Sequence, residues 1–215
     1  MPSVTAYKAR TAYLDPAVVD GYEQYRFSGP RGRYVWRREQ RGVGAMVALV
    51  GSARRILDCP TGNGRWLPVL RSLEPELIVQ GDLSPAMLAA SRARAVQPWA
   101  GVQAEAERLP FGDGVVDLVF CHALTKHLPQ ETQAAVLAEF ARVSSAYVLC
   151  SFSVSQGLPG LLRRLRGEGL SRPVTQAWLE AAAAAAGLRV VDSIACTTPV
   201  GLERSVLFAK VGTAA

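Results

Sequence analysis

The stretch ILDCPTGNG at residues 56–64 joins an apolar run to a loop of small residues. The run, extended to residues 54–58, predicts a buried strand, and residues 65–73 have the apolar spacing of a helix. Glycines in the loop between them allow positive φ and a close approach of the backbone to a ligand. A strand, such a loop and a helix in this order indicate one unit of a parallel α/β sheet, with a ligand site beyond the end of the strand.

Short apolar runs and helical patterns alternate through the rest of the chain. The patterns predict strands over 76–82, 101–105, 115–121 and 146–154, helices over 84–96 and 130–143, then a helix over 175–186 and two final strands over 189–196 and 204–211. Near-continuous runs of Val, Ile and Leu are typical of parallel strands buried on both faces. No helical pattern separates the last two strands, so we expect an antiparallel hairpin there.

Two segments interrupt or precede this alternation. Residues 1–50 lack a strand signal and predict two helices, near 16–27 and 30–50, while residues 154–174 predict a short basic helix. The formal net charge is +6, and its excess lies on residues 1–50 and 154–174 rather than on the near-neutral residues 51–153. One interpretation is a solvated, arginine-rich surface, and the other is an anionic partner held near both segments.

Composition bounds the class of protein. The chain has 215 residues, of which 49% are hydrophobic and 20% charged, so we expect one domain with a real core and no extensive disorder. The first residues have no apolar segment typical of a secretory signal, and no run approaches the roughly 18 apolar residues of a membrane span. We therefore expect no membrane partner and a cytoplasmic location. The four cysteines are expected to be buried and reduced, and the two histidines, without a ligand cluster, predict no metal site.

The loop after the first strand predicts the kind of ligand. Pro60 stands where the dinucleotide fingerprint requires its first glycine, and it removes an N–H group that a pyrophosphate would use. Asp82 ends the second strand, where a carboxylate can accept hydrogen bonds from a ribose diol, and Leu83 after it can cover a face of adenine. Glu105 ends the third strand and can accept from an adenine amino group, while the backbone N–H of Ala106 can donate to a ring nitrogen. These positions predict a nucleoside-bearing ligand without a pyrophosphate, which disfavours a nucleotide-dependent oxidoreductase.

Three stretches carry a resemblance to a known family. ILDCPTGNGRWL, IVQGDLSPAML and VQAEAERLPFGDGVVDLVFCHALTKHL resemble, in order and spacing, the motifs of class I S-adenosylmethionine-dependent methyltransferases. The most similar subgroup is that of small-molecule enzymes like the ubiquinone and menaquinone biosynthesis methyltransferases. The resemblance covers residues 54–154 and the final hairpin. It implies a Rossmann-like α/β fold, with a mostly parallel seven-stranded sheet, a C-terminal antiparallel hairpin and helices on both faces.

The resemblance also implies a domain organisation and a set of cofactor-binding residues. Residues 1–50 would form a helical N-terminal lid, and residues 51–215 the methyltransferase core, with a basic insert at 154–174. S-adenosyl-L-methionine is the implied cofactor. Its methionine part would pass the loop that follows the first strand, its ribose would bind the acidic residue of the second strand, and its sulfonium would lie near the end of the fourth. The implied residues are Asp58, Cys59, Gly62, Gly64, Asp82, Leu83, Glu105, Ala106 and Cys121.

Two departures from the family pattern and two alternatives accompany these roles. Pro60 replaces the first glycine of the family's loop, and Glu105 replaces the usual Asp. Asp58 has a second interpretation as a group that caps the strand end. Glu105 has a second interpretation as a solvated loop residue.

The candidate catalytic residues are the two histidines of the sequence, His122 and His127, which both follow the fourth strand. Methyl transfer mainly requires orientation of the reactants, and a base is needed only where the acceptor must first lose a proton. His127 matches a histidine common in the family and would serve as a general base or hold the acceptor. The alternative is a hydrogen-bonded structural role. His122 is the second candidate for these roles. The segment CHALTKHL offers no clustered acidic ligands, so no catalytic metal is expected.

The acceptor is predicted to be a small molecule. Enzymes that methylate amino groups of nucleic acids usually carry an Asn/Asp-Pro-Pro-aromatic motif after the fourth strand, and residues 121–124 read Cys-His-Ala-Leu. The basic segments 1–50 and 154–174 lead us to hypothesise an anionic acceptor. Two alternatives stay open: a methyltransferase for RNA or another phosphate-bearing macromolecule, and a non-catalytic protein of the same fold that binds the cofactor. The sequence gives no oligomeric state.

Overall fold

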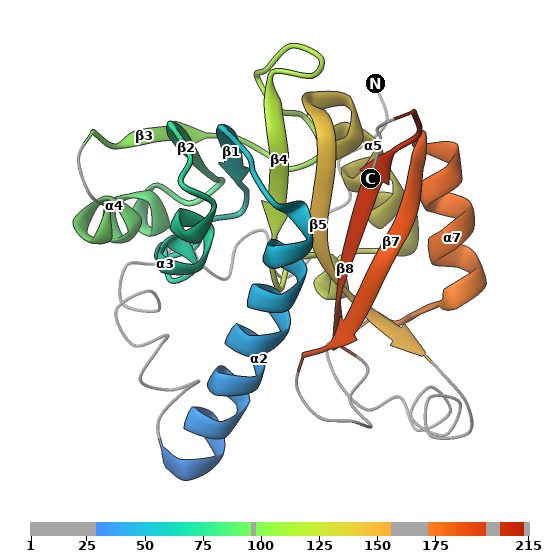
Figure 1. Cartoon of the computed structure of the whole chain (residues 1–215), viewed down its shortest axis with the longest axis horizontal. Helices are drawn as coiled ribbons and strands as arrows, with labels where there is room; N and C mark the ends of the chain where they lie inside the picture. The colour runs from blue at the N-terminus through green and yellow to red at the C-terminus, as the bar shows by residue number, and fades with distance from the viewer. Residues whose placement is uncertain (1–28, 96–97, 156–171, 197–202, 213–215) are drawn as a thin grey trace.

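The strands of the computed structural model form one mixed sheet (Figure 1). The structure describes residues 29–95, 98–155, 172–196 and 203–212. The strands are β1 (Arg55–Asp58), β2 (Leu77–Asp82), β3 (Ala100–Gln103), β4 (Val116–Cys121), β5 (Ser144–Ser155), β6 (Val174–Thr175), β7 (Leu188–Ala195) and β8 (Glu203–Lys210). Their order across the sheet is β3-β2-β1-β4-β5-β8-β7, with β6 paired to β5 off this path.

The sheet is parallel from β3 to β5 and antiparallel beyond it. β1 pairs in parallel with β2 on one side and with β4 on the other. Strands β2 and β3 are therefore added on one side of β1, and β4 and β5 on the other, so the strand order reverses between β1 and β4. β8 lies between β5 and β7 and is antiparallel to both. The predicted seven-stranded, mostly parallel sheet with a final antiparallel hairpin is therefore confirmed, and the two-residue β6 adds to it. Loops at the carboxyl ends of β1 and β4 meet where the order reverses, which is where such sheets bind ligands.

The helices largely follow the sequence signals. They are α2 (Gly29–Val50), α3 (Leu67–Leu70), α4 (Pro85–Arg94), α5 (Gln130–Val143) and α7 (Gln176–Ala185), with the 3₁₀ turns η2 (Arg71–Leu73) and η3 (Thr125–His127). The hydroxyl of Ser84 accepts the N–H of Met87 at 3.2 Å at the start of α4, and that of Thr175 accepts the N–H of Trp178 at 3.1 Å at the start of α7. Both are N-caps, which satisfy backbone donors that a first helical turn leaves open.

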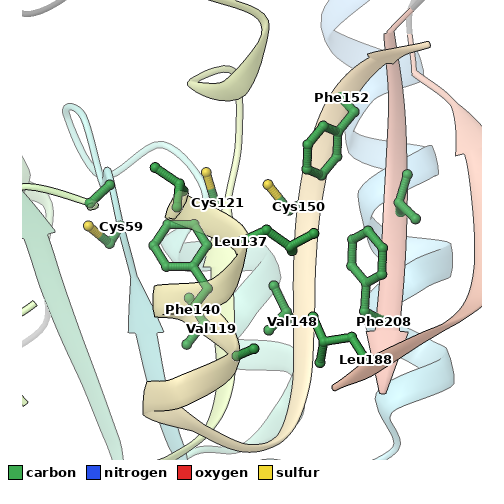
Figure 2. Packing of buried hydrophobic residues seen from close by; sticks show 14 of the residues in the cluster. Cys59, Val119, Cys121, Leu137, Phe140, Val148, Cys150, Phe152, Leu188 and Phe208 are labelled. Atoms are coloured by element: carbon green, nitrogen blue, oxygen red, sulfur yellow. The ribbon is translucent and has the colours of Figure 1, made fainter. Parts of the chain in front are cut away.

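Two hydrophobic layers cover the two faces of the sheet. Leu118 and Phe120 of β4 pack with α2 and α3, whereas Val119 and Cys121 of the same strand pack with α5 and α7. Figure 2 shows the second layer, in which Phe140 of α5 lies over the strands. Because successive side chains of a strand point to opposite faces, both sets of β4 residues are buried, and this explains the continuous apolar run in the sequence.

Some boundaries differ from the predictions. The helix expected over 65–73 is divided into α3 and η2, and β5 begins at Ser144, two residues before the expected strand. The helix expected near 16–27 and the basic helix within 154–174 lie outside the described residues. All four cysteines are buried and free of disulfides, as expected. None of the described helices has the length and apolarity needed to cross a membrane.

Candidate active site

A cavity lies at the carboxyl ends of the parallel strands. Its walls come from the loop after β1, the end of β2 with the start of α4, the loop after β3 and the loop after β4. Eight of the residues singled out from the sequence line it: Cys59, Gly62, Asp82, Leu83, Glu105, Ala106, His122 and His127. Asp58, Gly64 and Cys121 do not line it, and Asp58 and Cys121 are buried behind the wall. The topology thus gathers residues that are more than 60 positions apart in the sequence.

Asp82 connects the end of β2 to the first loop. Its Oδ2 accepts the backbone N–H of Gly62 at 2.9 Å, and its Oδ1 accepts the N–H of Ser84 at 2.9 Å. Burial raises the pKa of this carboxyl, and the two N–H groups oppose that effect. A carboxylate offers about four acceptor positions. Since the backbone N–H of Leu83 also bonds to this carboxyl, at least one position is left for a ligand in the cavity that the residue lines.

Asp58 lies beneath the loop, not in the cavity wall. Its Oδ2 accepts the hydroxyl of Thr61 at 2.8 Å, and Thr61 in turn accepts the side-chain amide of Gln80 at 2.9 Å. Its other oxygen, Oδ1, is buried without a hydrogen-bond partner. Burial raises the pKa of Asp58 to about 7, and the charge of Asp82 adds to the rise. An acceptor atom left unsatisfied in the interior costs free energy, which a donor arriving from a ligand would recover.

The backbone of the first loop is committed to internal hydrogen bonds. The N–H groups of Cys59 and Thr61 donate to the carbonyls of Phe120 and Gly81 at 2.9 and 2.8 Å, and the N–H of Gly64 donates to Thr61 at 3.1 Å. With Gly62 N–H held by Asp82, these donors do not face a ligand. A pyrophosphate needs such free donors. The geometry therefore agrees with the sequence in disfavouring a dinucleotide.

Gly64 is needed for the shape of this loop. Its φ is +77°, and a Cβ there would come within 3.2 Å of Ser91 and of the Leu67 side chain. The loop therefore packs closely on α4 while its other side faces the cavity. Asn63, between the two glycines, lines the cavity, and its Oδ1 is buried without a hydrogen-bond partner. Asn63 Oδ1 is an acceptor suited to a cationic ammonium group in the cavity.

The loop after β4 carries both histidines to the same cavity. Ala123 has φ of +65°, an unusual value for a residue other than glycine. Its N–H donates to the hydroxyl of Ser151 at 2.7 Å, and the hydroxyl of Thr125 donates to the carbonyl of the same serine. These bonds to β5 hold the backbone on both sides of the strained residue. His127 ends the turn η3 that follows and lines the cavity.

His122 lies among aromatic and cationic side chains. Its Nδ1 is 3.1 Å from a guanidinium nitrogen of Arg65, and its ring centre is 4.6 Å from that of Trp66. Arg65 also forms an ion pair with Glu39 of α2, at 3.4 Å. Arg65 and Trp66 line the cavity, yet the sequence patterns assigned residues 65–73 only to a helix.

Other cavity residues were also missed. Pro60, Thr61 and Asn63 belong to the loop at residues 59–64, which was assigned as a whole; those outside the sequence-based set are Arg65, Trp66, Ser84, Met87, Ala104, Glu107, Ala123 and Leu124. Most are direct neighbours in the sequence of predicted residues, so the ends of the strands correctly located the cavity. Periodicity does not tell which neighbours turn toward a ligand.

Comparison with known proteins shows similarity to methyltransferases. A model of the family described as "Methyltransferase domain" matches residues 56–146. The demethylmenaquinone methyltransferase of Deinococcus radiodurans is 35% identical over 138 residues, which are 60% of this chain and 55% of that protein. The corresponding enzyme of Mycobacterium tuberculosis is 34% identical over 121 residues, or 55% of this chain and 47% of that protein. Over residues 56–146 the chain is therefore similar to the methyltransferase-domain family. It spans about half the length of these curated relatives.

Solved methyltransferase structures share the fold of this domain. Magnesium protoporphyrin IX methyltransferase from Synechocystis, with bound SAH, superposes with a TM-score of 0.74 at 15% identity, covering 94% of this chain and 98% of that one. A 1,6-didemethyltoxoflavin-N1-methyltransferase from Burkholderia thailandensis gives 0.64 at 21% identity, covering 97% and 92%. The residues that line the cavity fit S-adenosylmethionine. Asp82 and Asn63 line the cavity, where Asp82 offers acceptors to a ribose and Asn63 offers a buried acceptor to an ammonium.

Proposed function

We propose that this protein transfers a methyl group from S-adenosylmethionine to a small-molecule acceptor. The observation that carries the proposal is the cavity at the reversal point of the sheet, with Asp82 in its wall and both histidines at the loop after β4. When bound, the cofactor supplies an activated methyl group on a sulfonium. The chain's own residues then have to orient the two reactants and exclude water.

In this proposal, the two ends of the cavity have separate tasks. Asp82 binds the ribose hydroxyls, Leu83 and Ala106 contact adenine, and Glu105 accepts from the adenine amino group. Cys59, Gly62 and Gly64 shape the loop along the methionine part, with Asp58 beneath it, and Cys121 backs the wall near the sulfonium. These roles are supported by the lining of the cavity and by the buried acceptors of the first loop.

The acceptor end is formed by the loop after β4. His122, Leu124 and His127 line it together with Trp66, so it combines an apolar surface with two imidazoles. We assign to His127 the role of general base or of a group that holds the acceptor. Such a base contributes typically 10²- to 10⁴-fold to a rate where proton removal is needed.

The charge of the acceptor and the location of the protein are also proposals. The arginines exposed on α2, Arg31, Arg33, Arg37 and Arg41, support an anionic acceptor or one on an anionic carrier. Arg163 and Arg164 of the basic segment 154–174 lie outside the described residues, and reversal of their charge should weaken acceptor binding. Four free, buried cysteines support a reducing, cytoplasmic environment.

Thermal unfolding with S-adenosylmethionine, S-adenosylhomocysteine and NAD tests cofactor binding. A ligand at 100 times its Kd adds about 2.7 kcal/mol to the free energy of unfolding. We expect the first two to raise the melting temperature and NAD to leave it unchanged. Stabilisation by NAD alone would contradict the proposal.

Label transfer tests the reaction itself. Methyl-tritiated S-adenosylmethionine would be supplied with demethylmenaquinone, magnesium protoporphyrin IX, 1,6-didemethyltoxoflavin, extracted small metabolites or total RNA. We expect label in a small molecule, whose mass then identifies the acceptor. Label confined to RNA would support the macromolecular alternative, and cofactor binding without any transfer would support a non-catalytic protein.

A further inference from the structure

An unexpected ion pair links α2 to the wall of the cavity. Glu39 is fully buried in a helix that is otherwise rich in arginine, and its Oε2 lies 3.4 Å from Nη1 of Arg65. The Arg65 side chain is only 8% exposed. A buried guanidinium requires a compensating charge, and Glu39 supplies it. The ion pair thus stabilises the buried guanidinium of Arg65 beside the loop that follows β1.

Two indole rings restrict where the guanidinium can lie. The Cζ atom of Arg65 is 5.2 Å from the ring centre of Trp36 and 5.0 Å from that of Trp66. The two tryptophans are themselves in contact, with ring centres 5.0 Å apart. Arginine over an aromatic face is attracted by the ring electrons. Arg65 is therefore fixed by a carboxylate and by two aromatic faces.

The second nitrogen of the guanidinium meets His122. Nη2 of Arg65 is 3.1 Å from Nδ1 of the imidazole. A guanidinium has five N–H donors and no acceptor, so Nδ1 must accept in this contact. A neutral imidazole that accepts at Nδ1 carries its hydrogen on Nε2. An imidazolium, which has N–H on both nitrogens, cannot make this bond.

Two neighbouring aromatic rings contact the ring of His122. Trp66 lies 4.6 Å away between ring centres, and Phe120 lies 6.4 Å away with its plane only 15° from that of the imidazole. These neighbours oppose the ring flip that would exchange the two nitrogens. The arginine contact therefore favours one tautomer, and the neighbouring rings restrict movement of the imidazole.

We propose that Arg65 is a positioning residue, which holds His122 as a neutral hydrogen-bond donor through Nε2–H toward the methyl acceptor. The donor role rests on the proposed function, whereas the tautomer does not. Since both nitrogens of His122 are then committed, one accepting from Arg65 and one carrying hydrogen, His122 is not a general base. His127 remains the only imidazole in the sequence for that task. The acceptor that fits has a lone pair on oxygen or nitrogen beside its reacting atom.

Nitrogen-15 NMR of the imidazoles tests the tautomer directly. The chain has two histidines, so a His127→Gln variant assigns both sets of signals. At neutral pH we expect His122 to show a protonated Nε2 and an unprotonated Nδ1. A coupling across the hydrogen bond, between Nη2 of Arg65 and Nδ1 of His122, is expected in arginine- and histidine-labelled wild-type protein. A protonated Nδ1, in either the other tautomer or an imidazolium, would overturn the proposal.

A pair of arginine variants tests the cause. Arg65→Met should let the His122 nitrogens exchange between tautomers, while Arg54→Met, which removes an exposed arginine paired with Glu76, should leave them unchanged. An unchanged His122 spectrum in folded Arg65→Met would overturn the positioning role. If that variant does not fold, the coupling in the wild-type protein decides. Binding of S-adenosylhomocysteine, measured by calorimetry, separates this outcome from failure of the proposed function, since the tautomer is expected whether or not the cofactor binds.

Discussion

The carboxylate of Asp82 accepts the backbone N–H of Gly62 at 2.9 Å, which ties the end of β2 to the loop after β1. The same carboxylate lines the cavity. One side chain therefore both shapes the loop and offers acceptors to a ligand, so its removal should affect two properties.

Asp82→Ala should weaken binding of S-adenosylhomocysteine by roughly 10- to 100-fold, because hydrogen bonds to a charged group contribute about 1.5–3 kcal/mol each. Isothermal titration calorimetry measures the loss. Asp192→Asn, at an exposed position of β7, is the control and should bind as the wild type does. Equal affinities for Asp82→Ala and the control would show that the ribose is held elsewhere.

The contribution of Asp58 to the free energy of unfolding should fall as the pH rises. Burial raises its pKa to about 7 in the folded state, so the folded protein binds a proton between pH 4 and 7 that the unfolded chain has released. The stabilisation is present below the unfolded pKa and is lost as the pH rises through the folded pKa. Relative to Asp58→Asn, wild-type protein should lose on the order of 4 kcal/mol over this range. Urea unfolding of both proteins at several pH values measures it. Parallel stability curves would contradict the assignment.

Removal of Glu39 should leave Arg65 buried without its counter-charge. Breaking a buried ion pair from one side costs about 3–5 kcal/mol, so Glu39→Leu should lower the free energy of unfolding by about 3 kcal/mol. Gln40→Leu, at the adjacent half-buried position of α2, is the control and should change it by about 0.5 kcal/mol or less. Urea denaturation compares the two. Similar effects would mean that the pair adds nothing to stability.

Two glycine substitutions should have opposite effects. Gly64→Ala forces a Cβ to within 3.2 Å of Ser91 at φ of +77°, and should destabilise the protein by about 1–3 kcal/mol. Gly44→Ala, in α2, meets nothing within 4 Å and should stabilise it by about 0.5–1 kcal/mol. Thermal unfolding gives both signs. A neutral Gly64→Ala variant would show that the loop relaxes away from α4.

Local signals predicted much of the fold. Ser84 and Thr175 cap helices as expected, because capping depends on residues a few positions apart. The final two strands pair as a hairpin, because their connection is too short for a crossover. The insertion of β8 between β5 and β7 was not predicted, since the apolar pattern of a strand does not specify its neighbours.

The site was predicted in outline only. The ends of the strands identified Asp82, Leu83 and Glu105 as cavity residues, because parallel strands end at one edge. The same rule also selected Asp58, whose side chain is buried beneath the loop and does not line the cavity. The contacts of Arg65 with Glu39 and His122 span 26 and 57 residues, and no periodicity connects such positions.

The place of β8 has a consequence for synthesis of the protein. β7 leaves the ribosome before β8, yet among the described strands it pairs only with β8. Until residues 203–210 emerge from the exit tunnel, most of one edge of β5 stays open and β7 has no partner. Open strand edges pair readily with other chains. The nascent polypeptide is thus exposed to edge-to-edge aggregation until β8 has paired with both strands.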